Sequence, residues 1–159
     1  MFALAGIIIG LGTPLLDAWQ AEQGGDAPRG GTNPSWPFVL TAIALFVLQY
    51  AASGALEQPL LDVTLLGGLP ALDCLLAATA IALWAAFDGT RQGLFMACLT
   101  AVCGPAVEIT LINVFHLYTY THPQWLGVPL WIPWVYFAGS LAVGNLARRV
   151  SSTLQSRRR

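Results

Sequence analysis

Long apolar runs alternate with short polar segments along this chain, and five of the runs are long enough to be membrane spans. The last run, from Leu130 to Ala147, would extend through roughly the 30 Å hydrocarbon core of a bilayer at about 1.5 Å per residue. A segment in lipid must satisfy its backbone hydrogen bonds internally, which favours α-helices. The pattern therefore predicts an all-α, polytopic transmembrane bundle of five helices. The predicted spans are residues 2–19, 36–56, 71–87, 93–115 and 130–147.

The segments between the predicted spans differ in character. Residues 20–35 are rich in Gly, Pro, Asn and charged residues, which indicates an aqueous loop. Residues 57–70 are apolar but contain proline and glycine, so we expect an interfacial or re-entrant linker. Residues 88–91 form a tight turn, and residues 116–129 form a polar, aromatic loop.

The composition indicates a membrane protein with a single domain over residues 1–159. Of these residues 56% are hydrophobic and 9% are charged, whereas soluble domains contain about 25% charged residues. The three cysteines lie in apolar runs and are expected to be buried, reduced thiols. Two histidines, His116 and His122, lie six apart, which is weak evidence for a metal site. We predict no metal, no other cofactor and no nucleic-acid partner.

The distribution of arginines predicts the orientation. The chain has no lysine and seven arginines, and cytoplasmic loops carry an excess of basic residues. With five spans, a cytoplasmic C-terminus places Arg29, Arg91 and the basic tail of residues 150–159 on the same side. The segments on the other side contain neither Lys nor Arg. The C-terminus is therefore predicted to be cytoplasmic.

Glu108 is the main candidate for a functional residue within the spans, because ionisable groups in lipid are costly. It follows Gly104-Pro105, which should kink the helix and open a cavity lined by Glu108, Thr110 and Asn113. A carboxyl group at low dielectric favours its neutral form, so we expect Glu108 to donate a hydrogen bond. The alternative is a buried glutamate that only helps the helices to pack.

Other polar and small residues give weaker indications. Asp17 and Asp73 are expected at the membrane edges, as solvated or helix-starting residues. Ser140 and Gly144 stand four apart on one helix face, so a neighbouring helix could approach closely there. Asn145 is the only amide of the last run and should point into the protein.

Three stretches resemble the Insig family of membrane proteins, whose eukaryotic members retain the sterol-sensing protein Scap in the endoplasmic reticulum. Residues 83–93 read Leu-Trp-Ala-Ala-Phe-Asp-Gly-Thr-Arg-Gln-Gly and are similar to the family's Leu-Trp-Trp-Thr-Phe-Asp-Arg-Ser-Arg-Ser-Gly turn. Residues 120–123 and 131–139 contain Tyr-Thr-His-Pro, Trp-Ile-Pro and Phe-Ala-Gly. Residues 143–148, Val-Gly-Asn-Leu-Ala-Arg, resemble the family's Val-Gly-Asn-Ile-Gly-Arg. Eukaryotic members have six spans, and this chain matches from the second.

The resemblance implies a regulatory protein of sterol or cholesterol homeostasis that binds a sterol-like lipid or diacylglycerol among its helices. Either Glu108 or Thr110 would match the family's sterol-proximal glutamine. Asp88 matches an aspartate associated with Scap binding; its alternatives are to cap the following helix or to pair with Arg91. The candidate lipid-binding residues are Glu108, Thr110, Asn113, Asn145, Gln49 and Trp84. The candidate partner-binding residues are Asp88 and Arg91.

These observations favour a non-catalytic lipid-binding protein that modulates partner membrane proteins. The alternatives are an intramembrane enzyme acting on a lipid or sterol through Glu108 or Asp73, and a small transporter using Glu108. A Scap-like partner is expected only in a eukaryote, and oligomer formation stays open. The composition favours a bacterial cytoplasmic membrane, with the endoplasmic reticulum as the eukaryotic alternative.

Overall fold

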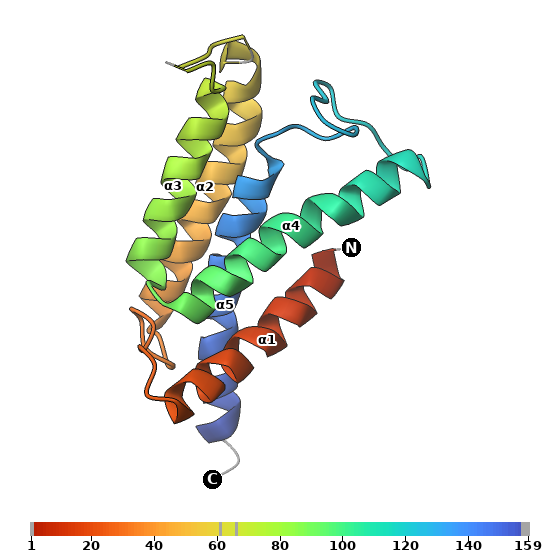
Figure 1. Ribbon diagram of the computed structural model, residues 1–159. Coiled ribbons are helices and arrows are strands. Elements are labelled where there is room, and N and C mark those ends of the chain that lie inside the picture. The colour runs from red at the N-terminus through yellow and green to blue at the C-terminus, as the bar shows by residue number, and fades with distance from the viewer. Residues whose placement is uncertain (1, 61, 66, 157–159) are drawn as a thin grey trace.

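The protein is an all-helical bundle, as the sequence predicts (Figure 1). The structure, a computed structural model, describes residues 2–60, 62–65 and 67–156. Within these ranges, β pairing is limited to two isolated bridges, Thr64 with Pro70 and Trp125 with Val128. The helices of the described residues are α1 (Phe2–Glu22), α2 (Trp36–Leu60), α3 (Ala71–Phe87), α4 (Arg91–Asn113) and α5 (Ile132–Ser156).

Helix α5 is the centre of the bundle and contacts each of the other four helices. Helices α2 and α3 pack on one another, and α1 packs on α4. Figure 1 shows the two pairs running in different directions, so that they diverge toward the end of the bundle opposite the C-terminus. Ring contact between Phe38 and Phe87, with centroids 5.0 Å apart, joins α2 to α3 near the other end.

Small residues on α5 allow close helix contacts. A Cβ atom placed on Gly144 would lie 3.3 Å from the Thr13 hydroxyl of α1, which confirms the predicted close approach at this face. A Cβ on Gly139 would lie 3.2 Å from the Phe46 ring of α2. Asn145 is fully buried, as predicted. Helices in lipid associate through close backbone contacts of this kind, because an apolar side chain gains little when it moves from lipid into a helix contact.

The apolar exterior agrees with a membrane environment. Large hydrophobic side chains point outward, among them Leu15 with 69% and Val102 with 70% of its surface exposed. Helices α2 and α4 are each long and apolar enough to cross a membrane, and α3 is a shorter apolar helix. All three cysteines are free, but Cys98 and Cys103 are exposed on this apolar exterior, so their predicted burial is wrong.

Several predicted boundaries shift in the structure. Helix α5 continues past Ala147, so residues 150–156 of the predicted basic tail are helical, and residues 157–159 lie outside the described residues. Helix α2 continues through Pro59 to Leu60, which shortens the predicted linker. Pro105 lies inside α4 and does not end it. The assignment of one domain, with membrane spans at the predicted positions, stays a prediction.

We predict that Gly144→Leu destabilises the protein, because a branched side chain would overlap Thr13 at the contact between α1 and α5. Overpacking of this kind costs about 1–3 kcal/mol. Thermal unfolding in detergent measures the effect. Gly10→Leu is the matched control, since a Cβ on Gly10 has no atom within 4 Å. Equal melting temperatures for the two variants would contradict the prediction.

Candidate functional site

A cavity of about 450 Å³ lies among α1, α2, α4, α5 and the loop that precedes α5. Its lining is mainly apolar and aromatic, with side chains such as Ile9, Phe46, Val135 and Val143. This volume is within the range of about 300–1,000 Å³ typical of small-molecule sites. The lining residues with polar groups are Tyr50, Thr100, Glu108, Tyr120, Tyr136 and Ser140.

Glu108 is the acidic residue among the described lining residues, and two tyrosines hold it in place. Its side chain is 4% exposed. The Tyr136 hydroxyl of α5 donates to Oε1, and the Tyr120 hydroxyl of the loop donates to Oε2, each at 2.5 Å. Both carboxyl oxygens thus accept a tyrosine hydroxyl, and the donor role expected of Glu108 from the sequence stays a prediction. The two hydrogen bonds connect α4 to α5 and to the loop.

Gly104 makes this arrangement sterically feasible. A Cβ atom at this position would overlap the ring of Tyr136. Because α4 has no side chain there, the ring lies against the α4 backbone and its hydroxyl reaches Glu108, one turn further along. The predicted role of Gly104-Pro105 as a kink stays a prediction; the structure gives Gly104 a packing role.

The loop tyrosines remain protonated. Burial and the neighbouring Glu108 raise the pKa of Tyr118 to about 12 and raise the pKa of Tyr120 as well. The rings of these two tyrosines contact edge to face, with centroids 5.9 Å apart. A phenol whose pKa is raised keeps its proton at neutral pH, so Tyr120 stays a hydrogen-bond donor to Glu108.

Thr110 and Asn113 were predicted to line the cavity with Glu108, and the structure does not place them there. The Thr110 hydroxyl donates to the Ala106 carbonyl on an exposed face. The Asn113 amide donates to the carbonyls of Ile109 and Leu126. The reason is helical geometry: positions two and five residues beyond Glu108 lie about 200° and 140° around the helix from it.

Gln49, Trp84 and Asn145 are also not among the described lining residues. The Gln49 amide donates to the Leu76 carbonyl at 3.1 Å and joins α2 to α3. The Asn145 amide donates to the Phe87 carbonyl at 3.2 Å and joins α5 to α3. The Trp84 indole donates to the Thr90 carbonyl at 3.1 Å. Of the predicted lipid-binding set, the structure brings only Glu108 to the cavity.

A second polar cluster lies near the C-terminal end of the bundle, where Arg148 pairs with two aspartates. Its Nε is 2.7 Å from Asp17 Oδ2, and its Nη1 is 2.7 Å from Asp88 Oδ2. Arg148 is 2% exposed, and the two aspartates are similarly buried. The sequence interpretation of Asp17 as a solvated residue at the membrane edge is therefore wrong. Each of these three charged groups can be buried because it is paired with a group of opposite charge.

The turn between α3 and α4 positions Asp88 for this cluster. Gly89 adopts a positive φ of 72°, and the backbone N–H and hydroxyl of Thr90 both donate to Asp88 Oδ1. The Thr90 hydroxyl also accepts from the Gly93 N–H, so Thr90 is the N-cap of α4. A Cβ on Gly93 would overlap the Asp88 carboxylate.

The alternative roles proposed for Asp88 are corrected by these contacts. Thr90 caps α4, and Asp88 pairs with Arg148 instead of Arg91. Asp88 is 3% exposed, so its carboxylate is not available on the surface for a partner. Arg91 is exposed. The partner-binding roles predicted for Asp88 and Arg91 stay predictions. Because Asp88 is buried, its effect on a partner would have to be indirect.

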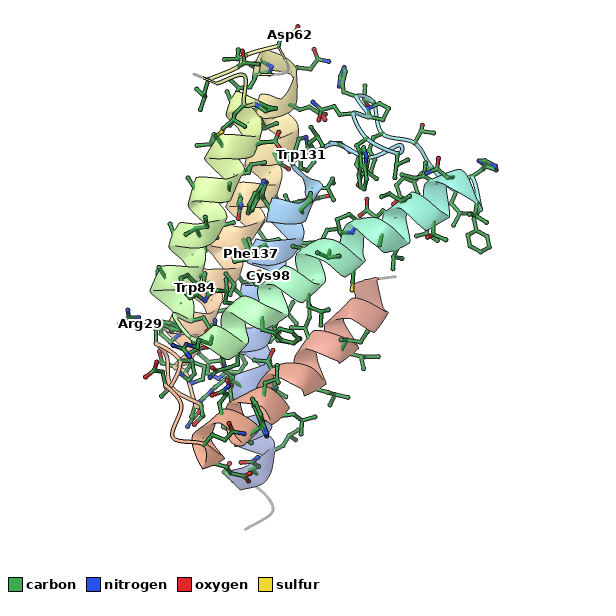
Figure 2. The ribbon with its side chains drawn as sticks, in the orientation of Figure 1. Arg29, Asp62, Trp84, Cys98, Trp131 and Phe137 are labelled. Atoms are coloured by element: carbon green, nitrogen blue, oxygen red, sulfur yellow. The ribbon has the colours of Figure 1, made fainter. Side chains whose placement is uncertain are left out.

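His122 belongs to a third cluster, which includes Trp131; Figure 2 shows Trp131 toward the opposite end of the bundle from Arg29. Its Nδ1 lies 3.7 Å from Glu57 Oε2, and its Nε2 lies 2.9 Å from the Gln58 amide nitrogen. The Trp131 indole donates to Glu57 at 3.2 Å. Among the described residues, no three His, Cys, Asp or Glu side chains form a group able to hold a metal ion.

Sequence reasoning missed Tyr136 and Arg148, although a signal for both was present. Tyr136, Ser140, Gly144 and Arg148 recur every four residues, so they follow one face of α5. Ser140 and Gly144 were recognised as an inward face, and the same periodicity extends it in both directions. Tyr120 had no comparable signal, because it lies in a loop.

The helices define the class of this molecule as an all-helical membrane protein, with a cavity among its helices. Comparison gives the family: the family model described as insulin-induced protein (INSIG) matches residues 1–151. The chain belongs to this family.

Curated relatives agree with this assignment. The chain is 30% identical over 148 residues to the insulin-induced gene 1 protein of Danio rerio, covering 92% of this chain and 53% of the relative. Identity to the protein of that name is also 30% in Homo sapiens and 29% in Bos taurus, with 92% of this chain and 48% of each relative covered. The chain thus spans about half the length of these relatives. No solved structure matches it.

We predict that Arg148→Met destabilises the protein strongly, because Asp17 and Asp88 would be left buried without a counter-charge. Breaking a buried ion pair from one side costs about 3–5 kcal/mol. Thermal unfolding in detergent at neutral pH measures the effect. Arg91→Met, which removes an exposed arginine from the same end of the bundle, is the control. A loss of stability no larger than that of the control would show that the cluster does not hold the fold.

Proposed function

We propose that this protein is a non-catalytic regulatory membrane protein that binds a lipid in the cavity beside Glu108. The observation that carries the proposal is the cavity itself, which is apolar along most of its lining and has a polar group of Glu108, Tyr120 and Tyr136. An apolar site with a few convergent polar groups is the usual form of a small-molecule site. Membership of the INSIG family supports the regulatory role.

The lipid proposed from the family resemblance is diacylglycerol or a sterol-like molecule. Both are mainly apolar and carry a small polar group, which suits a cavity with one polar region. None of the described lining residues is basic, so the cavity offers no counter-charge to a phosphate head group.

The enzyme alternative has less support from the geometry. Acid–base catalysis requires two catalytic groups within hydrogen-bond reach of one reacting atom. Neither His122 nor Asp73 is among the described lining residues, and His122 contacts Glu57 and Gln58. The carboxyl oxygens of Glu108 are held by tyrosines.

Regulation would act through the helices that surround the cavity. Helix α1 contributes Gly6 and Ile9 to the lining and is joined to α5 and to the α3–α4 turn through Asp17 and Arg148. A lipid between α1 and α5 would therefore change how α1 packs, and with it the surface offered to another membrane protein. A Scap-like partner belongs to this proposal only in a eukaryotic membrane.

The proposed topology has the C-terminus in the cytoplasm of a bacterium, or on the cytosolic side of the endoplasmic reticulum in a eukaryote. Arg29 lies at the C-terminal end of the bundle and Asp62 at the other end (Figure 2). The positive-inside rule assigns the arginine-rich end to the cytoplasm.

We predict that single cysteines introduced beside Arg91 and beside His122 react with impermeant thiol reagents from opposite sides of the membrane. The native cysteines are first replaced by alanine. A cysteine beside Arg91 should react only from the cytoplasmic side, and one beside His122 only from the other side. Reaction of both from the same side would contradict the proposed topology.

We predict that Gly6→Trp reduces the amount of co-purified lipid at least several-fold without lowering the melting temperature. Gly6 lines the cavity, and a Cβ there has no atom within 4 Å, so the indole has room to occupy the lipid's place. Native mass spectrometry of the gently purified protein measures lipid occupancy. Gly10→Trp is the control, since Gly10 is equally open but is not among the lining residues. Equal lipid content in both variants would show that the co-purified lipid does not bind in this cavity.

A further inference from the structure

The α4–α5 loop, residues 114–131, forms part of the cavity wall. Tyr120 of this loop lines the cavity and donates to Glu108 of α4. The Asn113 amide of α4 donates to the Leu126 carbonyl of the loop at 2.8 Å. Figure 1 shows the loop returning from the C-terminal end of α4 to the start of α5, at the end of the bundle where the two helix pairs diverge. One side of the loop is therefore held by α4.

His122 attaches the same loop to the end of α2. Its Nε2 lies 2.9 Å from the Gln58 amide nitrogen, and its Nδ1 lies 3.7 Å from Glu57 Oε2. The other carboxyl oxygen of Glu57 accepts the indole N–H of Trp131, at the end of the loop. The loop thus joins α4 to α2, which belong to different helix pairs, at the end of the bundle opposite the Arg148 cluster.

The Nδ1 atom of His122 is buried from solvent and has no hydrogen-bond partner within the described part of the chain. Its distance of 3.7 Å from Glu57 Oε2 exceeds the length of a charge-assisted hydrogen bond, about 2.7–2.9 Å. When an imidazole is protonated, both ring nitrogens are donors and the ring is positively charged. A shift of about 1 Å would then turn this contact into a hydrogen-bonded ion pair. Gln58 suits both states, because rotation of its amide presents either a donor or an acceptor to Nε2.

The elements around His122 carry acids and no fixed positive charge. The chain has no lysine, and no arginine lies between Arg29 and Arg91 or between Arg91 and Arg148. The tyrosines of the loop, Tyr118 and Tyr120, stay protonated. The other acidic and basic groups of these elements are Glu57 of α2, Asp62 of the α2–α3 linker, Asp73 of α3, Glu108 of α4 and His116 of the loop. A positive charge on His122 is therefore attracted by its surroundings.

We propose that the α4–α5 loop is a lid on the cavity and that His122 is its pH-sensitive latch: protonation of the imidazole draws the ring onto the Glu57 carboxylate and holds the lid closed. Histidine is the side chain whose ordinary change of charge falls between about pH 5 and 8, so the latch strengthens as the pH falls through this range and weakens as it rises. With the latch weakened, lipid enters and leaves more readily. This inference rests on the proposed function, since it concerns access to the same cavity, and it adds the regulation of that site.

The first measurement follows the lid itself. Spin labels are attached to cysteines introduced at Ala55 of α2 and Thr119 of the loop, which are both exposed, after the native cysteines are replaced by alanine. The protein in nanodiscs of neutral lipid is studied by pulsed electron paramagnetic resonance at about pH 5.5 and about pH 8, which lie on either side of the ordinary histidine range. We expect a narrow distance distribution at the lower pH and a broader one, extending to longer distances, at the higher pH.

The second measurement follows the lipid. Protein in mild detergent is loaded with deuterated dioleoylglycerol, a neutral hydroxyl-bearing lipid, and is then diluted into an excess of the unlabelled lipid in the same detergent. Native mass spectrometry gives the rate at which the deuterated lipid is released. We expect release about fivefold slower at the lower pH, which is the effect of one ion pair at the upper end of the range for partly exposed pairs.

Two variants remove the latch from its two sides. His122→Asn keeps a short polar side chain that cannot ionise, and Glu57→Gln keeps an acceptor for the Trp131 indole but removes the charge. Each variant should give the same distances and the same release rate at both pH values. His116→Asn is the matched control, because His116 is an exposed histidine of the same loop with a φ of 51°, which asparagine tolerates. The wild-type pH dependence should persist in this control.

The outcomes separate this inference from the proposed function. If the wild-type distances are the same at both pH values, the latch is wrong while lipid binding stands. If the distances change but the release rate does not, the loop is not a lid and the inference is overturned. If His122→Asn or Glu57→Gln keeps the wild-type pH dependence, another group is its source and the latch is wrong; a variant that does not fold leaves the other to decide. If the protein takes up no dioleoylglycerol and co-purifies with no lipid, the proposed function itself fails, whatever the distances show.

Discussion

The pairing of Arg148 with Asp17 and Asp88 is the interaction on which the rest of the bundle depends. It joins helices α1 and α5 to the α3–α4 turn, and it requires three charges to be buried together. Buried ion pairs contribute little net stability compared with apolar packing, but a missing partner is severely destabilising. Such a cluster therefore acts mainly by excluding other arrangements of the three elements. Gly93 leaves room for the Asp88 carboxylate at the start of α4, and the Thr90 N–H donates a hydrogen bond to this carboxylate.

One face of α5 links this cluster to the cavity. Arg148 and Gly144 meet Asp17 and Thr13, which are also four residues apart on α1, so the two helices are in register and in close contact there. Further along the same face, Ser140 and Tyr136 line the cavity instead. The small residues bring α1 close at one end, and the large tyrosine lies against Gly104 of α4 at the other. Side-chain size along one face of α5 therefore determines where the helices pack closely and where they separate around the cavity.

The sequence predicts the local features well and the long-range ones poorly. The five apolar runs predict the five helices, because lipid leaves the backbone few alternatives, and Gly144 and Asn145 face inward as their surroundings indicate. Asp17 was misinterpreted because its partner is 131 residues away, and hydropathy alone cannot show which charges meet. Thr110 and Asn113 were grouped with Glu108 by closeness in sequence, although helical geometry separates them. Tyr120 lies in a loop, whose path no periodic pattern describes.

The division of the helices into two pairs has a mechanical consequence. The α1–α4 pair and the α2–α3 pair meet mainly through α5, and the ion-pair cluster joins the elements at one end. Any widening of the cavity then takes the form of a tilt about that end. The displacement grows with distance from the cluster, so the cross-sectional area of the protein changes in one leaflet and stays nearly constant in the other. A molecule that widens in this way would be sensitive to the lateral pressure of a single leaflet.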